Sequence, residues 1–206
     1  MNIHSITIET NPEAVEAAES FYCDALRLGD SVGVRASTQP TTGFRGFAPS
    51  LIFVQPGDVD AAVERALASG AQVLKPVEKS LWGYGGSFRA PDGTAWQIAS
   101  ANKTATGPAG GEVERLVLLL GVDGVKASKH FYQEHGLKAT KNFPAYVEFD
   151  SGAVKLALYK RAALAKQVGV DPEGTGAHRL AVVADGTFTD PDGYAWVTAE
   201  STVAAG

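Results

Sequence analysis

The chain has 206 residues and a formal net charge of −5, with 45% hydrophobic and 20% charged residues. This composition allows one or two compact units with a buried core, and the mild acidity argues against a dedicated nucleic-acid binder. A single cysteine, Cys23, excludes an intrachain disulfide. The start, MNIHSITIET, lacks the pattern of a signal peptide, and the longest apolar runs are far below the roughly 20 residues that cross a bilayer. We therefore expect a cytoplasmic protein that binds neither nucleic acid nor membrane.

The first strand–helix–strand unit is predicted at the N-terminus. Residues 3–10 alternate apolar and polar side chains, as a half-buried strand does. The Asn-Pro-Glu sequence at 11–13 is typical of a helix start, and this helix is expected to run to about Leu28. Two short strands complete the unit, at 31–37 and 43–47.

A second unit repeats this order. A strand at 50–55 leads to Asp58, which is expected to cap a helix that ends at Gly70. Pro-Asp-Gly favours a tight turn, because proline fixes φ and glycine tolerates positive φ. The remaining segments are a strand at 72–77, a loop at 82–86, a strand at 86–90, the turn at 91–93 and a closing strand at 95–99.

The second half of the chain follows a linker. Residues 103–111 (KTATGPAGG) lack periodicity and are rich in Gly, Thr and Ala, which is typical of a linker. The expected order is then a strand at 113–120, a helix at 123–135, strands at 138–143, 145–150 and 153–159, a short helix at 160–168 and a strand at 178–183. One helix and one strand are missing before Gly186, so the fourth unit is predicted to be trimmed.

Two sequence motifs occur twice. The segments GSFRAPDGTAWQIAS and GTFTDPDGYAWVTAE share glycine, a hydroxyl residue, phenylalanine, Pro-Asp-Gly and Ala-Trp at equal spacing. A Phe-Tyr pair ends the first helix of each half, at 21–22 and at 131–132. Such self-similarity indicates repeated structural units. We assign these recurring aromatic residues, with Trp96 and Trp196, to packing.

These motifs, in this order, resemble the vicinal-oxygen-chelate superfamily, which includes glyoxalase I, bleomycin-resistance proteins and extradiol dioxygenases. The resemblance covers nearly the whole chain. It implies an α+β fold of repeated βαβββ units that form curled half-barrel sheets with helices outside. The expected division is a glyoxalase-like module of two units at 1–102, a linker at 103–111 and a second module with a truncated last unit at 112–206. The first module is expected to form the better cleft.

In metal-dependent members of that superfamily, His, Gln and Glu side chains in the cleft hold a divalent ion, and the last strand reads Pro-Asp-Gly-x-x-Trp-Glu. The matching positions here are Gln97 and Val197. On the first strand the matching residue is Ser5, and His4 is one residue out of phase. The third unit offers no ligand at 115–117. We therefore expect no cofactor, a divalent metal being the disfavoured alternative, with His4, Gln97 and His178 either remnants of a metal site or ordinary polar residues.

The candidate site residues come from the strands and the glycine-rich loops. Candidates for catalysis are Glu9, Gln97 and His4, because a desolvated carboxylate or an imidazole can act as a base. Arg45 suits an anionic substrate group, and aromatic side chains can line an apolar pocket. The candidate substrate-binding residues are Ser5, Phe44, Arg45, Trp82, Tyr84 and Gln97. Glu148 also lies on a predicted strand, where a carboxylate can face the cleft.

Two functions remain open, because a fold does not fix a function. One is binding of a small organic molecule in the cleft together with metal-independent chemistry, as a glyoxalase-like lyase or isomerase. The other is sequestration of a small compound without chemistry, as in resistance proteins. The absence of the hairpin glutamate favours action without a metal. The expected partner is a small-molecule ligand, and the expected state is a monomer or a homodimer.

Overall fold

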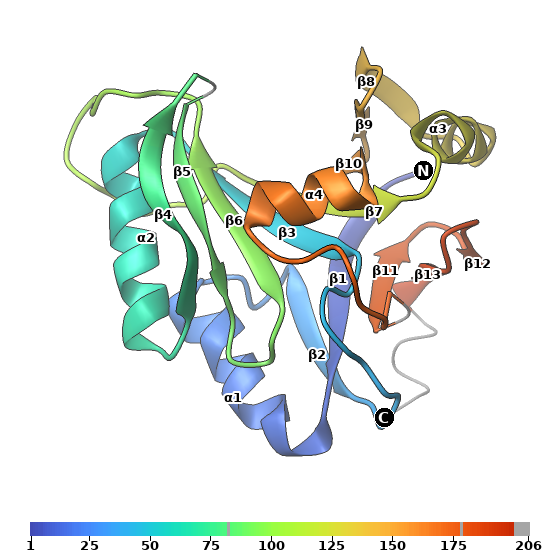
Figure 1. The fold of residues 1–206 in the computed structure, drawn as a ribbon, viewed down its shortest axis with the longest axis horizontal. Coiled ribbons are helices and arrows are strands. Elements are labelled where there is room, and N and C mark those ends of the chain that lie inside the picture. The colour runs from blue at the N-terminus through green and yellow to red at the C-terminus, as the bar shows by residue number, and fades with distance from the viewer. Residues whose placement is uncertain (82, 178, 200–206) are drawn as a thin grey trace.

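The computed structural model describes residues 1–81, 83–177 and 179–199. It is an α+β protein, as predicted, and most of its regular structure is strand (Figure 1). The helical segments are η1 (Pro12–Ala14), α1 (Val15–Ser20), η2 (Phe21–Ala25), α2 (Pro56–Ala68), α3 (Val125–Glu134) and α4 (Arg161–Val168). None of the helices in the described ranges is long and apolar enough to span a membrane.

The strands form two curled sheets. The five-stranded sheet has the order β12 (Phe188–Thr189), β13 (Ala195–Val197), β11 (Leu180–Ala184), β1 (Ile3–Thr10) and β2 (Val32–Ala36). The eight-stranded sheet has the order β4 (Gln72–Ser80), β5 (Gly83–Arg89), β6 (Ala95–Ser100), β3 (Phe47–Phe53), β7 (Arg115–Val122), β10 (Val154–Lys160), β9 (Tyr146–Asp150) and β8 (Lys138–Phe143).

Each sheet combines strands from both halves of the chain. Strand β1 pairs antiparallel with β11, and β3 pairs antiparallel with β7. The first unit therefore joins the fourth, and the second joins the third, which corrects our expectation that the first two units form one cleft. The division of the chain into two modules stays a prediction.

The predicted linker at 103–111 is irregular chain, and it is bound to the start of α2. The Gln55 side chain donates to the carbonyl of Pro108 (2.9 Å) and accepts from the amide of Thr106 (2.7 Å). The Asp58 carboxylate accepts from the amides of Gly110 and Gly111, at 2.8 and 2.9 Å. Asp58 is thus the third residue of α2 and holds the linker, whereas we expected it to cap the helix.

The first unit is shorter than predicted. The expected strand at 43–47 is absent, because Gly43 (φ 56°) and Gly46 (φ 87°) adopt left-handed conformations that a strand does not tolerate. Strand β2 pairs parallel with β1 directly. The predicted helix at 12–28 is divided into η1, α1 and η2 and ends at Ala25. No helix lies between β11 and β12, and the trimmed fourth unit stays a prediction.

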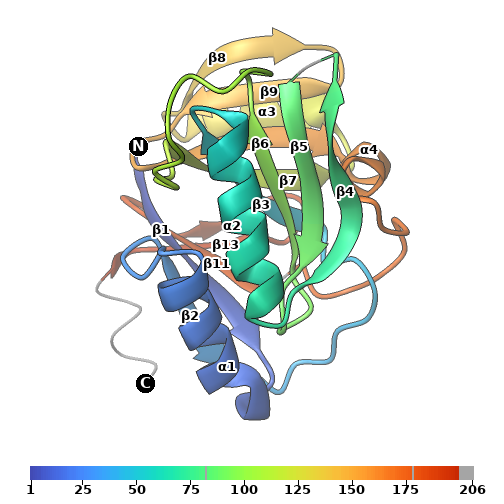
Figure 2. The ribbon, with the colours of Figure 1, turned by 90° about the vertical axis from the view of Figure 1, so that its left-hand side faces the viewer.

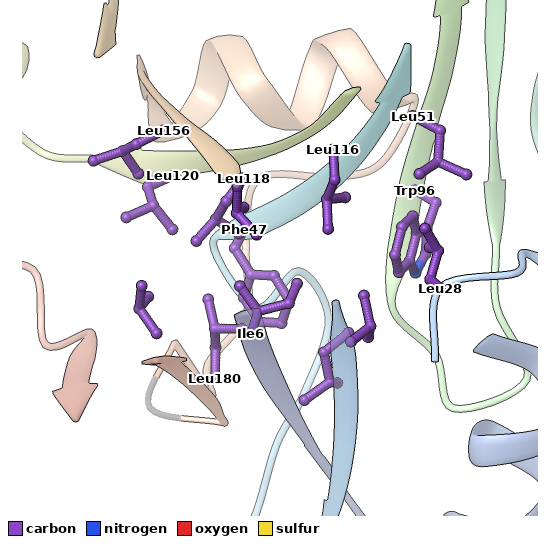
Figure 3. Close-up of a cluster of buried hydrophobic side chains, with 14 of the residues drawn as sticks. Ile6, Leu28, Phe47, Leu51, Trp96, Leu116, Leu118, Leu120, Leu156 and Leu180 are labelled. Atoms are coloured by element: carbon purple, nitrogen blue, oxygen red, sulfur yellow. The ribbon is translucent and has the colours of Figure 1, made fainter. Parts of the chain in front are cut away.

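The main core lies between the two sheets (Figure 3). Ile6 and Leu180 from the five-stranded sheet face Leu116, Leu118 and Leu120 of β7, and all five are at least 95% buried. Full burial of one such side chain contributes roughly 1.5–3 kcal/mol to folding. Strands β7 and β11 are buried at nearly every residue, so their sequences are continuous apolar runs rather than alternating patterns.

The recurring aromatic residues pack, as predicted. Tyr22 lies 5.3 Å from the ring of Trp96, and Tyr132 lies 5.3 Å from the ring of Trp196. Each Phe-Tyr helix therefore rests on one of the two Pro-Asp-Gly-x-Ala-Trp hairpins. The repeat in the sequence records this pair of equivalent contacts.

Helix α4 and helix α2 lie on opposite faces of the eight-stranded sheet. Figure 1 shows α4 crossing in front of β3 and β7, and in Figure 2 the sheet separates α2 from α4. Helix α4 contacts β7, β10, β3, β5 and β6. It buries a second, smaller apolar cluster made of Phe44, Ala48, Ala95, Val117, Leu119, Ala157, Leu164, Ala165 and Val168.

Candidate functional site

The eight-stranded sheet has a core face and a face toward α4, here called the α4 face. Ser50, Gln97 and Val117 belong to the α4 face, because their neighbours Leu51, Ile98 and Leu118 are in the main core and successive side chains alternate. Gln97 pairs with Ser50, and Ser50 pairs with Val117. The three therefore form one row across β6, β3 and β7.

Helix α4 covers the middle of this face. Leu164, Ala165 and Val168 of the helix pack on Ala48, Ala95 and Ala157, whose small side chains leave room for it. The helix is thus part of the packed interior rather than a separate surface element.

Both ends of α4 are fixed by hydrogen bonds. The hydroxyl of Ser87 donates to the carbonyl of Val168 (2.7 Å), and the ammonium of Lys75 lies 3.3 Å from two other C-terminal carbonyls. Such donors stabilise the free carbonyls and the negative end of a helix. At the other end Arg161 donates to the carbonyls of Pro172 (3.0 Å) and Gly174 (2.9 Å).

Beside α4 the same face carries a polar and aromatic group on β7, β8, β9 and β10. We call it the Tyr146–Glu148 cluster, and it consists of Arg115, Lys141, Tyr146, Glu148 and Tyr159. The Tyr146 hydroxyl donates to Glu148 Oε2 at 2.5 Å, and Lys141 Nζ lies 3.0 Å from the same oxygen. The rings of Tyr146 and Tyr159 are 4.9 Å apart. All these residues share a face because Glu148 pairs with Ala157, and Tyr146 with Tyr159.

The side chains of the cluster have fixed protonation states near neutral pH. Burial raises the pKa of Tyr146, and the hydrogen bond to Glu148 raises it further, so the phenol stays neutral. Burial alone would raise the pKa of Glu148, but the Tyr146 hydroxyl and Lys141 outweigh it, and the net pKa is lowered. Burial also raises the pKa of Tyr159. At neutral pH the cluster therefore presents an ionised carboxylate, fixed by two donors, next to two neutral phenols.

The predicted residues of β1 lie in the other sheet. Ser5 pairs with Val183, and Val183 pairs with Val197. The imidazole of His4 is bound to Asp185 (2.8 Å), with its side chain 53% exposed. The Glu9 carboxylate pairs with the guanidinium of Arg35. Ser5 and Gln97, expected to share a cleft, are thus in different sheets, and the roles of His4, Ser5 and Glu9 stay predictions.

Arg45 is buried and joins three segments. Its guanidinium donates to Thr94 Oγ1 (3.2 Å), to the carbonyl of Glu9 (3.3 Å) and to the carbonyl of Asp92, and the Asp92 carboxylate lies 3.8 Å away. With 7% exposure it is not placed to receive an anion from solvent. Next to it, Phe44 is buried under α4. The cavity these residues line measures about 10 Å³, room for about one water.

Tyr84 corrects the prediction for the glycine-rich loop. The loop at 83–86 is part of β5, and the Tyr84 hydroxyl donates to Asp60 of α2 at 2.6 Å. Tyr84 is therefore on the core face, away from Gln97. Two residues singled out from the sequence, Trp82 and His178, lie outside the described residues.

The side chains at the expected metal-ligand positions do not fit a divalent cation. The row on the α4 face is Gln97, Ser50 and Val117, and the row in the five-stranded sheet is Ser5 with two valines. One amide and two hydroxyl groups supply neither imidazole nor carboxylate. Within 1–81, 83–177 and 179–199, no three His, Cys, Asp or Glu side chains are grouped as metal ligands would be.

A shallow hollow lies elsewhere, at the turn between β11 and β12. It measures about 350 Å³ and is open to solvent. Its lining residues are Met1, His135, Asp185, Gly186, Thr187 and Phe188. This hollow belongs to the five-stranded sheet and the end of α3, and it contains none of the predicted substrate-binding residues.

Among the described strand residues that the sequence suggested for a site, the structure places Gln97 and Glu148 on the α4 face. Sequence analysis named Glu148 as a strand carboxylate but missed Arg115, Tyr146 and Tyr159 as members of a site. Tyr146 and Glu148 are two residues apart on one strand, which predicts a shared face. What the sequence could not supply is the pairing of β9 with β10 and of β10 with β7, which brings the cluster together.

The comparisons agree with this fold. Residues 29–98, about a third of the chain, match the family model of the Glyoxalase/Bleomycin resistance protein/Dioxygenase superfamily. Glyoxalase I from Zea mays has a TM-score of 0.59 and 12% identity, over 98% of this chain and 94% of that one. A candidate dioxygenase from Bacillus subtilis subsp. subtilis str. 168 has a TM-score of 0.56 and 15% identity, over 93% of this chain and 72% of that one. No curated protein matches the sequence.

The fold, the repeated hairpins and the match over residues 29–98 lead to one assignment. At 12% and 15% identity the solved structures establish the fold alone. The chain therefore has the fold of these solved structures, and its residues 29–98 match the model of the glyoxalase/bleomycin resistance/dioxygenase superfamily.

Proposed function

We propose that this protein binds a small organic molecule on the α4 face, at Gln97 and the Tyr146–Glu148 cluster, without using a metal. The observation that carries the proposal is the combination of a row that lacks metal ligands, Gln97, Ser50 and Val117, with a preformed polar and aromatic cluster on the same face. Few, well-placed polar groups beside aromatic side chains are typical of small-molecule sites.

The geometry supports binding over catalysis. A general base is most effective when its pKa is near the operating pH, whereas the pKa of Glu148 is lowered. The other candidate carboxylate, Glu9, is paired with Arg35. Helix α4 also covers part of the sheet face that a substrate could otherwise occupy. We therefore favour the sequestering function over a metal-independent lyase or isomerase.

Two further proposals accompany this function. The single cysteine fits a reducing compartment, and we propose a cytoplasmic protein. Either a monomer or a homodimer is compatible with a ligand site made from β6, β7, β9 and β10 of one chain.

The test is a fragment screen in EDTA, using small aromatic acids, amides and phenols and backbone NMR of the full chain. We expect saturable shifts at residues of β7, β9 and β10. Tyr159→Ala should weaken the same fragments about tenfold or more, because it removes one aromatic wall. Tyr84→Phe, on the core face, is the control and should leave affinity unchanged. If no fragment shifts the α4 face, the proposal is wrong.

A further inference from the structure

Three of the cationic side chains on the α4 face differ in their partners. Lys141 is 3.0 Å from Glu148, and Lys155 is 2.6 Å from Asp150. The guanidinium of Arg115 has no hydrogen bond to any described residue, and its Nε is buried without a partner. The nearest carboxylate oxygen, Oε1 of Glu114, is 3.7 Å from that Nε, beyond hydrogen-bonding distance.

Arg115 is also well placed for a ligand. It lies at the start of β7 and pairs with Ile52 of β3, whose side chain is partly buried on the α4 face. Its charge contributes to the lowered pKa of Glu148 and offsets a small part of the rise in the pKa of Tyr146. The guanidinium belongs to the cluster by its place on the α4 face, but it is not hydrogen-bonded to the other members. A guanidinium offers five donors in a planar fork, which match the two oxygens of a carboxylate.

We infer that Arg115 binds the carboxylate of the ligand, and that the ligand class is a small aromatic carboxylic acid. This inference rests on the proposed function and names its ligand. The carboxylate accepts from the free donors of Arg115, and the aromatic ring lies against Tyr146 and Tyr159. Glu148 does not repel a monoanion strongly, because Lys141 offsets its charge, whereas a dianion such as phosphate meets greater repulsion.

The experiment compares benzoate with benzamide, its neutral analogue, in NMR titrations that include the Arg115 Nε–H signal. We expect benzoate to bind the wild-type protein about tenfold or more tightly than benzamide and to shift the Nε–H signal. Arg115→Gln should abolish the preference for benzoate while benzamide still binds. Arg115→Lys should retain part of it, because an ammonium keeps the charge but not the fork.

Two controls make the result specific. Lys126→Gln removes one exposed positive charge from α3 and should leave benzoate affinity unchanged. Inorganic phosphate should bind more weakly than benzoate, and equal binding would overturn the assignment to a carboxylic acid.

The two proposals fail differently. Equal affinity of benzoate and benzamide at the α4 face, or an Arg115→Gln protein that still prefers benzoate, would overturn the inference but leave small-molecule binding intact. If neither these probes nor any fragment of the wider screen shifts the NMR signals of residues on the α4 face, the proposed function itself is wrong.

Discussion

Glu148 and Tyr146 form a pair whose chemistry follows from the donors around one carboxylate. Glu148 Oε2 accepts from both the Tyr146 hydroxyl and Lys141. Hydrogen bonds to the charged form of a carboxyl lower its pKa, even where burial opposes it. The pair therefore has a fixed protonation state near neutral pH, which suits recognition of a ligand.

Tyr146→Phe should expose the contribution of the phenol. Removing one hydrogen bond to a carboxylate should cost about 1.5–3 kcal/mol of unfolding free energy and raise the pKa of Glu148. Urea unfolding and carboxyl NMR measure the two effects. Tyr159→Phe is the matched control on the same face, because no described residue is hydrogen-bonded to its hydroxyl. Equal effects of the two variants would contradict the assigned hydrogen bond.

The pH dependence of stability follows from the lowered pKa of Glu148. A carboxyl with a folded-state pKa below its unfolded value stabilises the protein above the unfolded pKa, near 4.3. That contribution is lost as the pH falls through the folded-state pKa. The difference in unfolding free energy between the wild type and Glu148→Gln should be constant from about pH 5 to 7 and shrink below about pH 4. A difference that grows as the pH falls would contradict this account.

Arg45 is a structural residue in this fold, although its charge suggested an anion site. Arg45→Met removes one donor each from the carbonyls of Asp92 and Glu9, and it removes the cation that lies 3.8 Å from the Asp92 carboxylate. Breaking a buried pair from one side costs about 3–5 kcal/mol, so we expect a loss of that order in chemical denaturation. Arg115→Gln should change stability by less than about 0.5 kcal/mol, as surface changes usually do. A stable Arg45→Met protein would restore the predicted ligand role.

Helix α4 is the element that most changes the ligand face. The sequence RAALAKQV predicted a short helix at 160–168, and the structure confirms it at Arg161–Val168. Nothing in those eight residues indicates which sheet they cover. That depends on Ala48, Ala95 and Ala157, which are distant in the sequence and provide a flat surface only when their strands pair.

Removing an apolar contact of α4 tests whether the helix is a fixed part of the interior. Leu164 is completely buried, and truncation of a buried leucine typically costs about 2–5 kcal/mol. We expect Leu164→Ala to lose stability in this range in urea unfolding. Ala162→Ser, on the exposed side of α4, is the control and should cost less than about 0.5 kcal/mol. A small effect of Leu164→Ala would indicate a loosely attached helix.

The accuracy of the predicted strands depends on what determines the structure of each segment. The strand at residues 3–10 was located well because its apolar residues, Ile3, Ile6 and Ile8, are in the core. The strand expected at 43–47 had apolar residues at suitable spacing, but two glycines with positive φ turn the chain there. The pattern of apolar residues therefore predicts a strand well where side-chain burial determines the structure. It predicts poorly where glycines with positive φ determine the path of the backbone.

At the scale of the whole molecule, the repeats in the sequence predicted the fold but not which units pair through their first strands. Four units with two recurring hairpins are visible in the sequence, and the α+β fold with two curled sheets is confirmed. The order of units along the chain does not determine which first strands pair. Because β1 pairs with β11 and β3 with β7, Ser5 and Gln97 are separated, and a site assembled from the first two units could not be correct.

Divalent ions should not stabilise this protein. A ligand that binds only the folded state raises its stability by mass action, but the residues at the superfamily ligand positions offer one amide and no carboxylate. Thermal unfolding with Zn²⁺, Ni²⁺ or Mn²⁺ should therefore match unfolding in EDTA. A saturable rise in Tm with one of these ions, lost in Gln97→Ala, would contradict this prediction.

The most direct measurement of the central claim is a crystal structure of the full chain soaked with benzoate in EDTA. The account predicts density for the aromatic acid on the α4 face, with its carboxylate on Arg115 and its ring beside Tyr159. Density confined to the hollow at Asp185 and Phe188, or to the outer face of the five-stranded sheet, would contradict it.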